Sequence, residues 1–237
     1  MLTATVLVEI WSDVVCPWCY IGKRRFEAAL SRFEHADSVQ VRWRSFELDP
    51  RAPFRRSGGM ADHLAAKYGM TVEQARSRLA DMDRMAAAEG LAFDLARTQG
   101  GNTLDAHRLI HLAYEKGPAQ GAAMKEALLD AYFIKFQPVS DPDVLTAIGE
   151  AQGLDRSQVE ELLAGTRFTD EVRAEEAEAA ALGATGVPFF VVDRAFAIPG
   201  AQDPDTVLQV LRRAWERRPA VVVPSAGGAC DDDSCAI

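Results

Sequence analysis

The sequence has no long apolar run, and its first residues lack the basic stretch that opens an export signal. A bilayer-spanning helix needs about 20 consecutive apolar residues, and no segment of the 237 residues approaches this length. We therefore expect a soluble globular protein that is cytoplasmic and has no membrane partner.

Positive charge is also scarce. The 26 Lys and Arg residues face 35 Asp and Glu residues, which gives a formal net charge of −9. Nucleic-acid binding needs a clustered positive surface that neutralises phosphates, so we expect no nucleic-acid partner. The hydrophobic content of 48% is sufficient for a sizeable core, and no internal repeat is evident.

Cysteine is rare but placed in pairs. The four cysteines form two close pairs, Cys16 with Cys19 and Cys230 with Cys235. Static disulfides are unusual in a reducing compartment, so the pairs indicate catalysis, redox sensing or metal binding. Composition alone does not separate these three roles.

The opening segment predicts a βαβ unit. VLVEIW, residues 6–11, is typical of a buried strand, and Pro17 suits the first turn of a helix that continues to Phe33. VQVRWRSF, residues 39–46, alternates apolar and polar positions as a second strand does. The helix between them is long enough for a parallel crossover.

The middle of the chain predicts helices only. Near the C-terminus VPFFVVD and RAFAI indicate two strands, and DPDTVLQVLRRAWERR indicates a helix with an Asp N-cap, so this part is a ββα unit. The sequence divides into 1–55 with 184–218, an α/β domain; 56–183, a helical insertion; and 219–237, a mobile acidic tail. The expected insertion helices lie near 60–68, 72–89, 103–116, 119–136, 141–152, 156–164 and 168–182.

The first cysteine pair lies where a strand meets a helix. A cysteine at a helix N-terminus gains from free backbone N–H groups and the positive end of the helix dipole, so we expect a lowered pKa for Cys16. Cys19, one turn later, is close enough to resolve a mixed disulfide on Cys16. Pro17 and Trp18 between them tune the thiolate.

Two other interpretations of this pair stay open. Cys16 and Cys19 provide half of a tetrahedral zinc site, and Cys230 and Cys235 could provide the other half. The pair could also be inert core cysteines. Its position between an apolar strand and an amphipathic helix favours thiolate activation.

Several motifs together resemble the DsbA-like thioredoxin superfamily, and its FrnE-like branch in particular. The resemblance spans nearly the whole chain to about residue 218. It rests on SDVVCPWCYIGKRRF (12–26), FELDP (46–50), NTLDAHRL (102–109), GVPFFVVD (186–193) and IPGAQ (198–202).

The resemblance implies a thioredoxin fold carrying a large all-helical insertion. It also implies a cis peptide bond at Pro188, with the Val187 backbone groups offered to an extended substrate or thiol. Asn102 and His107 would lie along the cleft between insertion and thioredoxin domain, where His107 could stabilise the Cys16 thiolate. His107 and His111, four residues apart on one helical face, also fit a metal pair, but no third ligand is obvious and we expect no metal.

The resemblance implies a thiol:disulfide oxidoreductase acting on disulfide-containing proteins or small thiols, with the thioredoxin system as one source of electrons. No bound cofactor is expected beyond a small thiol co-substrate such as glutathione. Trp18 lacks the imidazole found between the cysteines of the strongest oxidants in the superfamily, so we expect an intermediate or reducing potential. Pro199 stands where the family has serine, which puts one small-thiol contact in doubt.

The second cysteine pair carries its own hypothesis. Three aspartates separate Cys230 from Cys235 and disfavour a thiolate on either. We hypothesise that this pair donates electrons to oxidised Cys16 and Cys19. The alternative is an acidic tail without a redox role.

Two rival functions remain. One is a kappa-type glutathione transferase or hydroxychromene carboxylate isomerase, which shares the fold and insertion but carries serine at the attacking position. The other is a zinc-stabilised binding or chaperone-like module. The intact CPWC motif favours the oxidoreductase.

Overall fold

The structure is a computed structural model that describes residues 5–217. Its centre is a four-stranded sheet of β1 (Val6–Ser12), β2 (Val39–Ser45), β3 (Phe189–Val192) and β4 (Phe196–Pro199). The strand order is β2-β1-β3-β4. β2 runs parallel to β1, whereas β3 runs antiparallel to β1 and β4 antiparallel to β3. The expected βαβ unit followed by a ββα unit is confirmed.

Three helices cover the two faces of this sheet. α1 (Pro17–Leu30) and α9 (Pro204–Glu216) lie side by side on one face, and α8 (Thr169–Ala181) packs against β1 and β2. α9 begins where the sequence predicts, because the Asp203 side chain accepts a hydrogen bond from the Thr206 N–H. The face under α1 and α9 holds most of the apolar core of the sheet, including Val8, Ile10, Phe26, Phe190, Val207 and Leu211.

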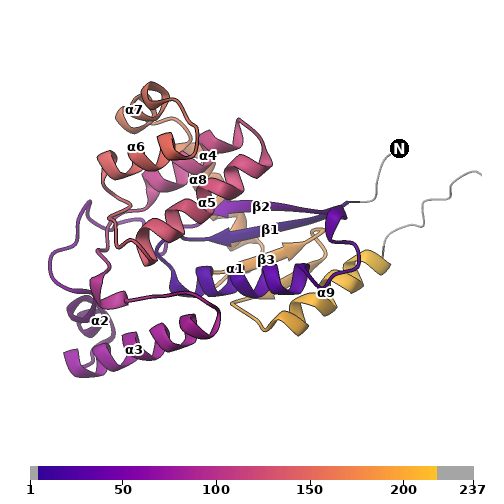
Figure 1. Cartoon of the computed structure of the whole chain (residues 1–237), viewed down its shortest axis with the longest axis horizontal. Coiled ribbons are helices and arrows are strands. Elements are labelled where there is room, and N and C mark those ends of the chain that lie inside the picture. The colour runs from indigo at the N-terminus through magenta and orange to yellow at the C-terminus, as the bar shows by residue number, and fades with distance from the viewer. Residues whose placement is uncertain (1–4, 218–237) are drawn as a thin grey trace, which may run out of the picture.

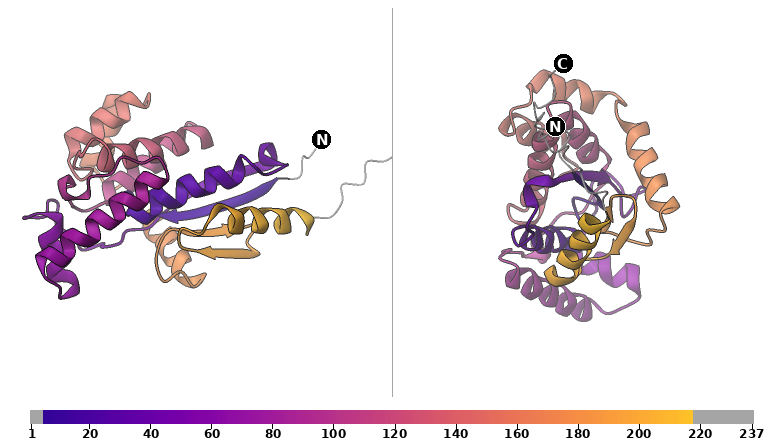
Figure 2. Two further views of the ribbon diagram at one scale, coloured as in Figure 1. Left: turned by 60° about the horizontal axis from the view of Figure 1, so that its bottom comes forward. Right: turned by 90° about the vertical axis from the view of Figure 1, so that its right-hand side faces the viewer.

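Between β2 and β3 the described chain forms helices joined by loops and contains no strand. The helices fall within a few residues of the expected positions. α2 and α3 extend from the end of the molecule opposite the C-terminal end of α9 (Figures 1 and 2). The helices that precede α8 are α2 (Met60–Tyr68), α3 (Val72–Ala88), α4 (Leu104–Tyr114), α5 (Pro118–Phe133), α6 (Pro142–Ala151) and α7 (Arg156–Ala164).

The helical segment shares a core with the CPWC helix. Val14, Tyr20 and Ile21 belong to the same buried cluster as the apolar faces of the insertion helices. Tyr20 packs against Phe93 and Phe133, with ring centroids 5.9 Å away in both cases. The insertion therefore packs directly on the helix that carries the cysteines. The proposed domain boundaries remain a prediction.

Two local details differ from expectation. α1 ends at Leu30 and does not continue to Phe33. The reason is a tightening of its last turn, where the Arg32 N–H bonds to the Ala29 carbonyl three residues back. Short 3₁₀ turns at Ala36–Ser38 and Leu95–Arg97 were also not expected. Among residues 5–217, no helix has the length and apolarity that crossing a bilayer requires.

Candidate active site

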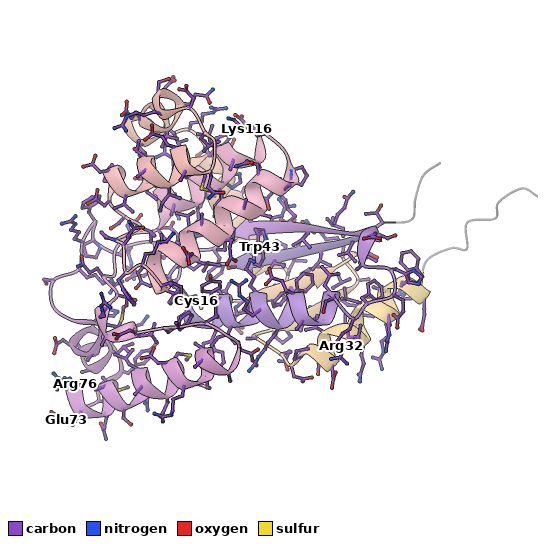
Figure 3. All side chains as sticks on the ribbon, in the orientation of Figure 1. Cys16, Arg32, Trp43, Glu73, Arg76 and Lys116 are labelled. Atoms are coloured by element: carbon purple, nitrogen blue, oxygen red, sulfur yellow. The ribbon has the colours of Figure 1, made fainter. Side chains whose placement is uncertain are left out.

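The CPWC motif opens α1. Cys16 is the N-cap residue, with extended backbone angles, and Pro17 takes the first helical position. The Cys19 N–H donates to the Cys16 carbonyl at 3.0 Å, which closes the first turn. Both cysteines are free thiols, and Figure 3 shows Cys16 at the end of α1 that faces the insertion helices.

The two cysteines differ in access. Cys16 is 4% exposed and lines a cavity, whereas Cys19 is 0% exposed. Trp18 lines the same cavity and is 37% exposed. An incoming disulfide can therefore reach the outer sulfur, while the inner sulfur is reached only through it.

The loop before β3 faces Cys16. The Val187–Pro188 peptide bond is cis, as the resemblance implies. The Cys16 Sγ lies 3.6 Å from the Val187 carbonyl oxygen. The Gly200 N–H, in a residue with a φ of 73°, donates to the Pro188 carbonyl at 2.8 Å.

Glycine allows α1 to approach this loop. A Cβ on Gly22 would lie 2.8 Å from the Pro188 ring and 3.3 Å from the Ala201 side chain. Such contacts are too close for any larger residue without displacement of the loop. The glycine of the IGKRRF segment thus fixes the distance between the helix of the cysteines and the cis-proline loop.

A buried carboxylate lies next to the cysteines. Asp13 is 1% exposed and accepts hydrogen bonds from the backbone N–H groups of Val14 and Leu48 at 2.7 and 2.8 Å. Its carboxylate also lies 3.3 Å from Nε2 of His107. Burial by itself raises the pKa of Asp13, but the hydrogen bond and charge of His107 and the Leu48 N–H bring it below its usual value.

A buried lysine from the insertion completes the site. Lys125 of α5 is 1% exposed, and its ammonium donates to the Ser12 carbonyl at 3.0 Å. Burial lowers the pKa of Lys125 to about 8, against the opposing effect of the Cys19 and Asp13 charges. Lys125 was not predicted. The one sequence feature that could have identified it is a lysine on an otherwise apolar helix face, which also carries Leu128 and Leu129. Both leucines are fully buried in the structure.

The protonation of the cysteine pair differs from expectation. The pKa of Cys16 is raised, first by the hydrogen bond to Cys19 and then by burial. Burial also acts to raise the pKa of Cys19, but the hydrogen bond from Cys16 and the Lys125 charge lower it overall. The expected lowering of the Cys16 pKa is therefore wrong for the resting dithiol. The first negative charge lies on the inner sulfur, because that sulfur accepts a hydrogen bond and lies near the ammonium.

Asn102 and His107 take supporting positions. The Asn102 side chain accepts from the Leu104 N–H at 2.9 Å at the start of α4. Thr103 is the N-cap residue but makes no side-chain cap. His107 is 1% exposed and contacts Asp13. His107 therefore lies next to the dithiol on the far side of the Asp13 carboxylate, and its role in catalysis remains a prediction.

A second group of charged side chains, centred on the buried carboxylates of Glu9 and Glu175, lies under α8. We call it the sheet-face cluster; it consists of Glu9, Arg44, His111, Glu175 and Arg194. Arg44 pairs with both Glu9 and Glu175, and His111 Nε2 lies 3.2 Å from Glu175. Burial acts to raise the pKa of Glu175, but the bonds from His111 and Arg44 lower it to about 2. His107 and His111 thus serve different carboxylates.

Within residues 5–217, no group of three or more His, Cys, Asp or Glu side chains is placed to hold a metal ion. The second cysteine pair, Cys230 and Cys235, and the whole predicted tail (219–237) lie outside the described residues. The tail relay and the four-cysteine zinc site therefore remain predictions.

Comparison with known proteins agrees with this geometry. Residues 7–212 match the family described as the DSBA-like thioredoxin domain. A probable DsbA oxidoreductase from Streptomyces coelicolor is 44% identical, with a TM-score of 0.86 over 98% of this chain and 99% of that chain. The uncharacterized protein YwbO of Bacillus subtilis is 29% identical over 208 residues, 85% of this chain and 93% of its own length.

More distant structures share the fold. The cytosolic disulfide reductase DsbM from Pseudomonas aeruginosa, solved with GSH, is 19% identical with a TM-score of 0.58, over 89% of this chain and 99% of that one. The family match extends from β1 into α9 and so includes both the cysteine helix and the cis-proline loop. The chain belongs to the DsbA-like thioredoxin domain family and is a thiol:disulfide oxidoreductase.

Proposed function

We propose that the Cys16 and Cys19 dithiol reduces disulfides in the cytoplasm. The observation that carries this proposal is the asymmetry of the pair. Two cysteine sulfurs, each of which shifts the pKa of the other, stand at the start of one helix, the outer one open to a cavity and the inner one fully buried near Lys125. This arrangement suits Cys16 to attack the substrate disulfide and Cys19 to release the bound substrate thiol.

The reaction has two exchange steps. As the Cys16 sulfur attacks one sulfur of the substrate, its proton passes to the Cys19 thiolate, and the other substrate sulfur leaves as a thiolate. Cys19 then gives this proton to the released substrate thiolate, near the Lys125 ammonium, and attacks the Cys16 sulfur of the mixed disulfide. This second step releases the remaining substrate thiolate and leaves a Cys16–Cys19 disulfide. Two electrons have passed from the protein to the substrate.

The cis-proline loop supplies the surface for the substrate. The Val187 carbonyl lies 3.6 Å from the Cys16 sulfur. An extended substrate segment bound along Val187 would bring its disulfide to that sulfur. The close approach of Gly22 to Pro188 sets the position of the loop relative to α1.

The source of electrons belongs to the same proposal. An external dithiol of the thioredoxin type, a small thiol such as glutathione, or the Cys230 and Cys235 pair would return the disulfide to the dithiol. The FrnE-like subtype is part of this proposal as well. Replacing both tail cysteines with serine tests the relay, because unchanged multiple-turnover reduction would remove it.

Two thiols in contact support redox chemistry over the transferase or isomerase reaction, which needs a bound thiol and no resolving cysteine. Zinc analysis of the untreated full chain tests the binding-module alternative. One equivalent of zinc per chain would favour the module, and its absence together with reactive thiols would favour the oxidoreductase.

Trapping with single-cysteine variants tests the mechanism and is the largest effect we predict. Cys19→Ser should accumulate mixed disulfides on Cys16, visible as a mass increase that dithiothreitol reverses. Cys16→Ser should form none, and its disulfide reduction should fall to the background rate. Adducts that form on Cys19 in the Cys16→Ser variant at the same rate would contradict the assignment of attacker and resolver.

A further inference from the structure

A cavity of about 430 Å³ opens next to Cys16. It lies between the α2–α3 pair of helices and the CPWC turn, and the Val187 loop forms part of its wall. Small-molecule sites in proteins have volumes of roughly 300 to 1,000 Å³. The cavity is therefore large enough for the body of a small molecule whose sulfur meets Cys16.

The walls of this cavity are mostly apolar. Two methionines, which adapt readily to different ligand shapes, lie among them. At the mouth, Leu48 and Tyr68 are 44% and 59% exposed. Covering such exposed apolar surface is favourable, so the lining selects a ligand with an apolar body. The main apolar lining residues are Leu48, Met60, Leu64, Leu79, Met82 and Phe133.

The rim of the cavity carries unpaired positive charge. Lys67 of α2 and Arg78 of α3 line it and are exposed, and neither has a carboxylate within 4.0 Å in the described part of the chain. Arg56, a third cation of the lining, pairs with Asp49, a carboxylate that also lines the cavity. Burial acts to raise the pKa of Asp49, but Arg56 and, to a smaller extent, the Lys67 charge lower it overall. The Lys67 ammonium lies 5.6 Å from the centroid of the Tyr68 ring, so its described contact is with an aromatic face and not with a carboxylate in an ion pair. Lys67 and Arg78 favour an anionic group at the rim.

The positions of Asp13 and of the rim cations also determine how an anionic ligand is oriented in the cavity. Asp13 lines the inner part of the cavity, and its carboxylate already accepts bonds from two backbone N–H groups and contacts His107. A second anion placed there would be repelled. The anionic group of a ligand therefore belongs at Lys67 and Arg78, its apolar body along the inner walls and its sulfur at Cys16.

We propose that the cavity selects low-molecular-weight disulfides that combine an apolar, ring-sized body with a carboxylate. This inference rests on the proposed function, since it names the substrate class of the same dithiol. Cys16 forms a mixed disulfide with the bound half of the substrate and releases the other half as a thiolate. Cys19 then releases the bound half, so one substrate disulfide becomes two thiols and the protein dithiol becomes a disulfide.

The test compares two aromatic disulfides in single-turnover stopped-flow experiments. 5,5′-Dithiobis(2-nitrobenzoate) carries a carboxylate on each ring, and 4,4′-dithiodipyridine is uncharged; both release a coloured thiol. The protein is the reduced full chain with Cys230→Ser and Cys235→Ser, so that only the active-site pair reacts. Comparing each variant with its parent for one reagent at a time cancels the intrinsic reactivity of the reagents.

We expect the Lys67→Gln/Arg78→Gln double variant to react about fivefold to tenfold more slowly with the carboxylate reagent and unchanged with the neutral one, because each exposed charge contributes modestly. The effect should shrink at high salt. The matched control is Arg76→Gln: Arg76 is an exposed arginine of the same helix, and Figure 3 shows it near the outer end of α3, away from Cys16. Met82→Gln should slow both aromatic reagents.

Equal slowing of both reagents by the double variant, or the same loss in Arg76→Gln, would overturn the inference and leave the proposed function intact. A rate that depends on the rim cations for a disulfide-linked acidic peptide, but not for the small reagents, would overturn the small-molecule assignment in favour of protein substrates. Reaction that persists at the parental rate after Cys16→Ser would instead remove the proposed function itself.

Discussion

Two groups of charged side chains lie against strands β1 and β2: the sheet-face cluster and the active-site group around Lys125. They differ in how completely their charges are paired. In the sheet-face cluster, Arg44 meets two carboxylates and Glu175 also meets His111. At the active site, Lys125 donates to a single backbone carbonyl, and among residues 5–217 it forms no ion pair within 4.0 Å.

This difference explains the two sets of pKa shifts. Paired charges hold each other in the charged form, which brings the pKa of Glu175 to about 2. Lys125 has no carboxylate partner in the described part of the chain, and burial is the main effect on it, which lowers its pKa to about 8. A group that titrates near neutral pH responds to the charge on a neighbouring sulfur. We therefore predict that the paired cluster supports the fold and that the group around Lys125 serves the chemistry.

The largest predicted difference between the sheet-face cluster and the active-site group around Lys125 concerns stability. Because the pKa of Glu175 is lowered in the folded state, its stabilising contribution is present above its unfolded pKa and is lost as the pH falls through about 2. Glu175→Gln should lower the free energy of unfolding by about 3 kcal/mol at neutral pH and flatten its dependence on pH in the acidic range. Urea unfolding at several pH values measures both.

The same variant should leave the active site unaffected. The rates of both exchange steps should match those of the wild type when they are measured well below the unfolding transition. A Glu175→Gln protein of unchanged stability, or one that is stable but slow in thiol exchange, would show that the two clusters are not separate.

The next effect concerns rate. Lys125→Met removes the ammonium near Cys19, and raising the pKa of that thiol by one unit leaves about tenfold less thiolate at pH 7. The release step should slow by about this factor, and the dithiol should become more reducing by roughly 30 mV. Because Lys125 loses its charge above about pH 8, the difference from wild type should vanish at higher pH.

A second buried lysine provides the control. Lys23 lies 5.9 Å from the Trp43 ring, as Lys125 does, but it pairs with Glu27 and Glu126. Lys23→Met should not change the release step. Since burial disfavours the charged form of Lys125, Lys125→Met should be at least as stable as wild type at pH 7. A large loss of stability would assign Lys125 a structural role.

The smallest effects come from two histidines of α4. His107→Gln should change the rate of Cys16 alkylation by about threefold or less and alter its pH profile, because His107 acts through Asp13. His111→Gln should leave alkylation unchanged and cost about 1 kcal/mol of stability through Glu175. Exchanged outcomes for the two variants would contradict the division of roles.

Sequence reasoning placed the elements well because their signals are local. Apolar periodicity and Asp or Pro at helix starts located most helices within a few residues. The CPWC turn was identified because a strand leads directly into a helix with proline at its first position. The cis bond at Pro188 came from family resemblance, since a proline permits that geometry without requiring it.

The pKa of Cys16 shows where local reasoning fails. The position at the helix start predicted a lowered value, and that argument considers only the backbone of α1. The structure adds a second thiol that accepts a hydrogen bond and a lysine contributed by α5, more than 100 residues later. These long-range neighbours outweigh the helix end in the resting pair.

The sequence by itself determined the order of strands and helices, the pair of cysteines at a helix start and the family. Each of these depends on patterns among residues that are close together in the chain. Tertiary structure alone decided which buried charges meet. It placed Lys125 near Cys19, His107 on Asp13 and the cations of α2 and α3 on the rim of one cavity. Electrostatic interactions depend on distance and burial in space, and spacing along the chain does not specify either.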